Sequence, residues 1–197
     1  MWRRGFNTPI NNDDNGLNCG HIQNHPHSRK INCGVCGDPK SLRRPRPNEH
    51  GGTYGLGVIG REYNQGSNIQ VIVNITAAHR GRFTFAMCNL DRGHETEECF
   101  AKYPLKLADG SNMYRLPSPD YGRLHYINLK LPRDLTCNHC VLRWQWIAGK
   151  FDLLLTMYRV KCRKRRKLIP EKHNPFKAFT QTACAVNNFC IVKDICN

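Results

Sequence analysis

The histidine with the clearest chemical potential is His79, which follows a predicted strand. Apolar and polar residues alternate just before it, in the period-two pattern of a strand with one buried face, although Ile72 interrupts the polar side. A histidine at a strand end is most often a surface or hydrogen-bonded residue, but imidazole is also the commonest protein ligand for metals. His79 is therefore a candidate ligand, although the sequence around it offers no obvious partner. The alternating apolar residues are Ile69, Val71, Val73 and Ile75.

Cysteine is the second residue type with evident chemistry, because 11 of the 197 residues are cysteines. Such a density is typical of proteins that form disulfides in a secretory compartment, and an odd count leaves at least one thiol. Cys88 and Cys99 flank an acidic loop and suit a local disulfide. The triplet Asn74-Ile75-Thr76 is an N-glycosylation sequon and fits the same compartment. The sequence does not fix the pairing of the other disulfide candidates, which are Cys19, Cys33, Cys36, Cys137 and Cys140.

Two Cys-x-x-Cys pairs, at residues 33–36 and 137–140, also allow a zinc site. Zinc ribbons usually bring the second pair within about 15 to 20 residues of the first, whereas these pairs lie much farther apart. Disulfides to other cysteines are favoured, and zinc stays open as the alternative.

The start of the chain conflicts with secretion. Met1 is followed by Trp-Arg-Arg-Gly-Phe, without the apolar region and small-residue cleavage site of a signal peptide. We therefore expect that the printed sequence lacks its true N-terminal segment. It also has no run of about 18 apolar residues, so we expect no membrane span.

The positive charge is unevenly distributed. The formal net charge is +15, and a basic run at Lys161–Lys167 contributes strongly to it. Such a run occurs in nucleic-acid-binding segments and in solvated tails. Nucleic-acid modules usually interleave aromatic residues and glycines with their basic residues or place them on a helix, and this run does neither. Nucleic-acid binding is kept only as an alternative.

Turn residues punctuate the first 55 residues or so, which we expect to form long loops pinned by cysteines. Strand-like segments follow, without a convincing amphipathic helix between them. The pattern predicts an all-β fold, an antiparallel β-sandwich. A length of 197 residues with 40% apolar content suits one domain with an appendage. The candidate strands are residues 54–63, 68–76, 82–88, 124–131 and 137–147.

Seven ordered, cysteine-anchored blocks of the sequence resemble one known family. They are similar to the chitin-binding type-4 domains of arthropod copper-dependent lytic polysaccharide monooxygenases, auxiliary activity family fifteen. Together they cover most of residues 2–150. The blocks are Trp2–Asn11, Asn15–Gly20, Asn32–Pro39, Arg44–Ile59, Ile75–Phe83, Glu98–Asp109 and Leu131–Lys150.

The resemblance implies an immunoglobulin-like or fibronectin-type-III-like sandwich and a copper-dependent oxidation of chitin or cellulose. In the family, copper is held by the amino group and imidazole of an N-terminal histidine and by a second histidine, with an aromatic residue on the axis; nitrogen donors in such an arrangement suit copper. His79 matches the second histidine, and Ala77 matches the small residue that keeps the axial side open. The resemblance therefore makes His79 the copper ligand of this chain.

The chain departs from the family pattern at both ends. The family's N-terminal histidine lies upstream of the block that begins at Trp2, and Met1 supplies no imidazole. The similarity ends at Lys150, and Gln181 stands where the family places its axial aromatic residue. We therefore expect the chain as printed to bind copper weakly or not at all and to be inactive.

These observations predict a secreted, disulfide-bonded glycoprotein with Asn74 as the glycosylated residue. Residues 1–150 form the polysaccharide monooxygenase-like domain, and residues 151–197 form a divergent basic tail that contains cysteines. The expected partner is chitin or another crystalline polysaccharide, and we expect a monomer with no membrane or nucleic-acid partner. The alternatives are a non-catalytic polysaccharide-binding or cuticle protein and a basic nucleic-acid-binding protein.

Overall fold

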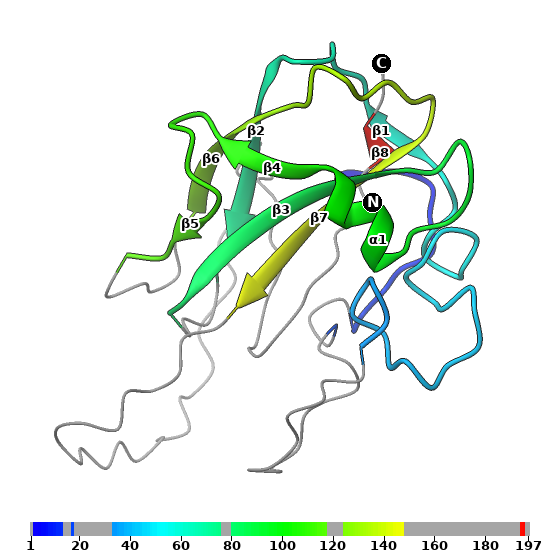
Figure 1. Cartoon of the computed structure of the whole chain (residues 1–197). Helices are drawn as coiled ribbons and strands as arrows, with labels where there is room; N and C mark the ends of the chain where they lie inside the picture. The colour runs from blue at the N-terminus through cyan, green and yellow to red at the C-terminus, as the bar shows by residue number, and fades with distance from the viewer. Residues whose placement is uncertain are drawn as a thin grey trace, which may run out of the picture.

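The computed structural model describes residues 2–13, 17, 33–75, 80–117, 124–147 and 194–195. These residues form a nearly all-β structure (Figure 1). The 3-10 helix η1 spans Trp2–Arg4 and the α-helix α1 spans Glu97–Lys102. The strands are β1 (Ile59–Arg61), β2 (Asn68–Asn74), β3 (Arg82–Asn89), β4 (Pro104–Leu107), β5 (Tyr114–Arg115), β6 (Leu124–Lys130), β7 (Cys140–Ile147) and β8 (Asp194–Ile195).

The strands pair in the order β1-β8-β7-β3-β4-β6-β2, and β5 pairs with β3. The pairing of β1 with β8 is parallel and the others are antiparallel. Strand β4 curls the sheet, because Leu105 pairs with Phe85 of β3 while Leu107 pairs with Leu129 of β6. The β3–β7 pair and the β2–β6 pair thereby face each other, so the predicted all-β sandwich is confirmed with its two faces joined through β4.

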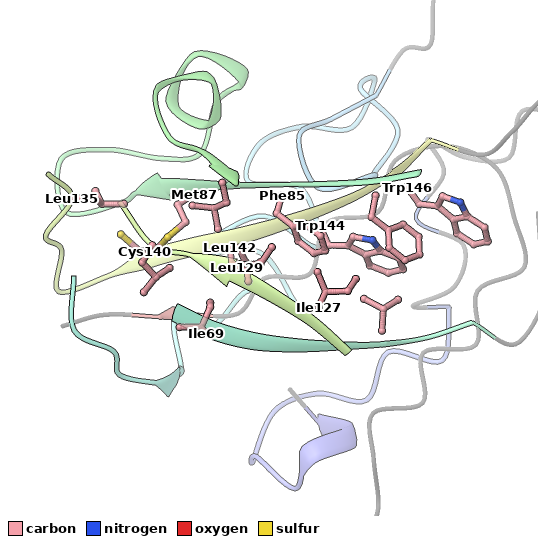
Figure 2. Packing of buried hydrophobic residues seen from close by; sticks show 14 of the residues in the cluster. Ile69, Phe85, Met87, Ile127, Leu129, Leu135, Cys140, Leu142, Trp144 and Trp146 are labelled. Atoms are coloured by element: carbon pink, nitrogen blue, oxygen red, sulfur yellow. The ribbon is translucent and has the colours of Figure 1, made fainter. Parts of the chain in front are cut away.

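The core lies between these two pairs (Figure 2). Strand β6 alternates strictly between exposed and buried residues, so its pleat turns one set of side chains inward and the other outward. Trp144 and Trp146 fill one end of the core, and Leu135 and Cys140 lie at the other (Figure 2). The remaining buried strand residues of this core are Ile69, Val73, Phe83, Phe85, Met87, Leu105, Ile127, Leu129 and Leu142.

A second, smaller apolar cluster lies beneath α1, on the other side of β3 and β7. Phe100 of α1 packs with Cys88 and Val141 there. Arg143 covers this cluster: its guanidinium lies 4.1 Å from the Phe100 ring centroid and 2.8 Å from the Glu97 carboxylate. The helix therefore seals the outer face of β3 and β7.

The strand predictions agree with the structure for four of the five segments, whereas in residues 54–63 only Ile59–Arg61 forms a strand, and α1 differs from the expectation of an all-strand domain. Helix α1 has only six residues, too few to show a helical period, and it begins at Thr96, whose side chain accepts a hydrogen bond from the Cys99 N–H at 3.0 Å. Strands β4 and β5 are also too short for an alternating pattern. Among the described residues, no helix is long and apolar enough to cross a membrane.

The cysteines divide into disulfides and one thiol within the described residues. Cys88 and Cys99 form the local disulfide that their spacing favours, and Cys137 pairs with Cys140. Cys33 is also disulfide-bonded, to a cysteine outside the described residues. Cys36, a disulfide candidate in the sequence, is instead a thiol, because its sulfur is buried against the Glu95 carboxylate, 4.0 Å from Oε1. Cys19 lies outside the described residues.

Candidate functional site

The turn that carries His79 connects β2 to β3. Ala77 and His79 themselves lie outside the described residues, as does Gln181, so the structure is described up to Ile75 and again from Arg80. Ile75 is fully buried in the core, and Arg80 has a φ of 51°. Both ends of the turn are thus placed by the sheet, and His79 is adjacent in sequence to one of them.

Two hydrogen bonds from neighbouring strands fix the β3 end of this turn. The indole Nε1 of Trp146 donates to the Arg80 carbonyl at 2.8 Å, and the Leu116 N–H donates to the Gly81 carbonyl at 3.0 Å. Arg80 and Gly81 both have positive φ, the region that glycine adopts freely and other residues rarely adopt. The two donors therefore hold the backbone of Arg80 and Gly81 directly before β3 begins.

Trp146 reaches the turn because of the β3–β7 register. It lies opposite Phe83, and both side chains are fully buried. The Phe83 ring contacts Trp144 and Trp146 at centroid separations of 5.1 and 5.8 Å, in edge-to-face arrangements. Such pairs add stability beyond the area that they bury.

A half-buried tyrosine, Tyr114, and a buried histidine, His125, complete the packing around Phe83. The Tyr114 hydroxyl and Nδ1 of His125 share a hydrogen bond of 3.1 Å, and only 3% of His125 is exposed. The two rings lie 5.9 and 6.0 Å from the Phe83 ring. We call Phe83, Tyr114, His125, Trp144 and Trp146 the aromatic base. The packed side chains of the aromatic base lie next to the turn, and a precisely placed ligand requires such a packed support.

Buried charges, in contrast, organise the long loops at residues 33–55. Glu49 is 1% exposed and accepts hydrogen bonds from Arg44 and Arg46. Burial alone raises the pKa of the Glu49 carboxyl, but the hydrogen bonds from Arg46 and Arg44 outweigh it and hold that pKa below its usual value. Glu95 is fully buried and accepts the backbone N–H of His50. These loops are therefore held by ion pairs and hydrogen bonds more than by apolar packing.

The metal chemistry of the described residues is limited. No group of three histidine, cysteine, aspartate or glutamate side chains within the described ranges could hold a metal ion. The zinc alternative fails, because Cys137 and Cys140 pair with each other and Cys33 is also in a disulfide. His79, which lies outside the described residues and directly precedes Arg80, stays the candidate copper ligand from the sequence.

Comparisons with known proteins agree with this fold. The family model for lytic polysaccharide mono-oxygenases, described as cellulose-degrading, matches residues 3–183. The chain therefore belongs to the lytic polysaccharide monooxygenase family, whose members use copper and act on polysaccharides. The match extends past Lys150, so the boundary that we predict there stays a prediction.

One solved structure similar to this chain is the lytic polysaccharide monooxygenase AA15 from Thermobia domestica in the Cu(I) state. The two are 35% identical, the match covers 100% of this chain and 93% of the other, and the TM-score is 0.73. No curated protein sequence matches the chain. The predicted family is thus confirmed both by the family model and by a structure.

The sequence did not reveal the aromatic base, although part of its signal was present. The alternation in residues 140–147 places Trp144 and Trp146 on one face of a strand. His125 lies two residues before the buried Ile127 and four before the buried Leu129, so it is on the same face of its strand. The contact between Trp146 and Arg80 joins residues 66 positions apart, which no local pattern indicates.

Proposed function

We propose that this protein, in a form whose amino terminus is a histidine ahead of Trp2, is a secreted copper monooxygenase that cleaves chitin oxidatively, with His79 as one of the copper ligands. The observation that carries the proposal is the 35% identity to a Cu(I)-state enzyme over the whole chain, combined with the two hydrogen bonds that anchor the turn next to His79. Copper, when bound, supplies the redox chemistry of the reaction.

The residues of the chain have a positioning role in this proposal. Trp146 and Leu116 hold the backbone of Arg80 and Gly81, and the Phe83 ring keeps the Trp146 indole in place. Because His79 directly precedes Arg80, a fixed Arg80 carbonyl restricts where the imidazole can go. A ligand held in place before the metal arrives binds with less loss of conformational entropy than a mobile one.

The substrate class follows from the family, and chitin is our choice within it. The matched family is described as cellulose-degrading, so cellulose is the competing substrate.

A direct test incubates the copper-loaded protein with chitin and with cellulose, each with a reductant and oxygen, and identifies soluble products by mass spectrometry. For this test we define the histidine-led form, in which processing exposes a histidine amino terminus ahead of Trp2. We expect oxidised chito-oligosaccharides from this form and none from its His79→Ala variant. Oxidised cello-oligosaccharides alone would overturn the choice of chitin, and equal activity in the variant would overturn the role of His79.

The same preparation separates the binding alternatives. Retention on chitin, a nearly neutral polymer, is expected to change little between low and high salt. Nucleic-acid binding through Lys161–Lys167 would fall steeply, with affinity dropping by roughly one logarithmic unit per tenfold rise in salt for each phosphate neutralised. Steeply salt-dependent retention on DNA, without retention on chitin, would favour the nucleic-acid alternative. Retention on chitin without oxidised products would favour the non-catalytic polysaccharide-binding alternative.

A further inference from the structure

The outer face of β2 and β6 carries an exposed apolar patch next to the turn. Along this face Asn74 pairs with Leu124, Ile72 with Tyr126, and Gln70 with Asn128. Tyr126 is 57% exposed and Leu124 is 38% exposed, whereas the Gln70 and Asn128 amides are hydrogen-bonded to each other at 3.1 Å. The face is therefore polar at one end and apolar at the end that bears Asn74. We call Ile72, Leu124 and Tyr126 the outer patch.

The sequon lies at the edge of this patch. Asn74 is the last residue of β2, is half-buried, and belongs to the only Asn-x-Ser/Thr triplet with x other than proline in the 197-residue sequence. It has the same parity along β2 as Gln70 and Ile72, opposite to the buried Ile69 and Val73, so its side chain is on the outer face. Strand β2 is also the last strand in the sheet order, so a large group on Asn74 can extend outward from the sheet.

We propose that Asn74 carries an N-linked glycan whose first sugar packs on the Tyr126 ring and covers the outer patch. Tyr126 is diagonal to Asn74 across the two strands, a separation of roughly 7–8 Å that an aromatic side chain can reach. The apolar face of a pyranose ring covers an aromatic face well, and burial of both removes apolar area from water. The glycan on Asn74, and not a separate partner, therefore covers the outer patch.

The glycan has a consequence for polysaccharide contact. A crystalline polysaccharide offers the same sugar faces as the glycan, and the bare outer patch would bind them on the outer face of β2 and β6, beside the turn that carries His79 and not at the turn itself. With the glycan in place, the outer patch is covered. The polysaccharide then contacts the end of the sheet that bears the turn with His79. This inference concerns glycosylation and does not depend on copper binding, so its failure leaves the proposed function standing.

Occupancy is tested on the full chain secreted from insect cells, beside Asn74→Gln and Thr76→Ser variants. Thr76→Ser is the matched control, because it changes the same triplet but preserves a sequon. We expect a glycopeptide that contains Asn74 in the wild type and in Thr76→Ser, and none in Asn74→Gln. An unmodified Asn74 in folded, secreted wild-type protein would overturn the proposal.

Packing of the glycan on Tyr126 is tested by enzymatic deglycosylation of the wild type and of Tyr126→Ser. We expect the wild type to lose roughly 2–4 °C in Tm, the change expected for the loss of one ring contact in a chain of this size. The variant should lose less than half of that, because the ring that the sugar covers is already gone. An equal loss in both proteins would contradict the contact. Weaker chitin retention of the glycosylated Tyr126→Ser protein would also contradict it, since Tyr126 would then contact the polysaccharide itself.

Discussion

The turn that carries His79 and the loops at residues 33–55 are both irregular segments, but they are stabilised in opposite ways. The turn rests on fully buried rings, with the Trp146 indole donating to the Arg80 carbonyl. The loops rest on a buried carboxylate, Glu49, between the Arg44 and Arg46 guanidinium groups. Aromatic packing is insensitive to pH and salt, whereas a buried ion pair fails when either partner is removed or neutralised. The two supports should therefore respond differently to the loss of a charged partner.

The largest effect is expected from Glu49→Gln, which breaks the charged support of the loops. The variant leaves the buried Arg46, and the exposed Arg44, without their anionic partner, and the loss at Arg46 in particular costs about 3–5 kcal/mol in the free energy of unfolding. Urea unfolding measures that cost, and hydrogen exchange locates it. Exchange should rise at residues 33–55 before it rises in β3. A loss below about 1 kcal/mol, or a uniform rise in exchange, would show that the loops are not held by this ion pair.

Trp146→Phe is expected to cost less stability than Glu49→Gln but to lower copper affinity selectively. Phenylalanine keeps an aromatic ring in the base but removes the N–H that reaches the Arg80 carbonyl together with part of the buried indole, so the cost in the free energy of unfolding should be about 2–3 kcal/mol. Copper affinity of the histidine-led form should fall about tenfold, the lower end of the range for the loss of a group that positions a metal ligand. Trp144→Phe is the control, because Trp144 packs on Phe83 in the same base, whereas the indole that donates to the Arg80 carbonyl belongs to Trp146. Equal affinities in the two variants would remove Trp146 from the positioning of His79.

The smallest effect is a pH dependence confined to the loops. Because the folded-state pKa of Glu49 is lowered, its stabilisation is fully present above the unfolded glutamate pKa of about 4.3 and is lost as the pH falls through the folded value. The difference in unfolding free energy between the wild type and Glu49→Gln should therefore narrow below about pH 4.3. Chemical denaturation at a series of pH values measures this difference. A difference that stays constant down to the acid unfolding transition would mean that Glu49 is not stabilised as an anion.

The same comparison explains what the sequence could predict. Strands β2, β3, β6 and β7 alternate in polarity or carry apolar runs, so their positions follow from local patterns. Local patterns do not predict the charged network, because Arg44 contacts the Glu95 carbonyl 51 positions away. In the sequence, Glu95 is only one residue of an acidic loop. His79 stood out because it follows an alternating strand. Its support was missed because Tyr114, His125 and Trp146 come from three separate strands that only the folded sheet brings together.

The central claim is that His79, held next to the aromatic base, is a copper ligand, and copper binding by the histidine-led form tests it most directly. Affinity is measured by calorimetry and donor number by electron paramagnetic resonance, for the parent and for His79→Ala. The controls are His21→Ala, His25→Ala and His27→Ala, because these three histidines lie between the family-like blocks Asn15–Gly20 and Asn32–Pro39 and match no ligand of the family. We predict a tight site with three nitrogen donors in the parent and in all three controls. His79→Ala should weaken it by more than the roughly 10–100-fold that loss of a positioning group costs. Unchanged affinity and nitrogen coupling in His79→Ala would contradict the account.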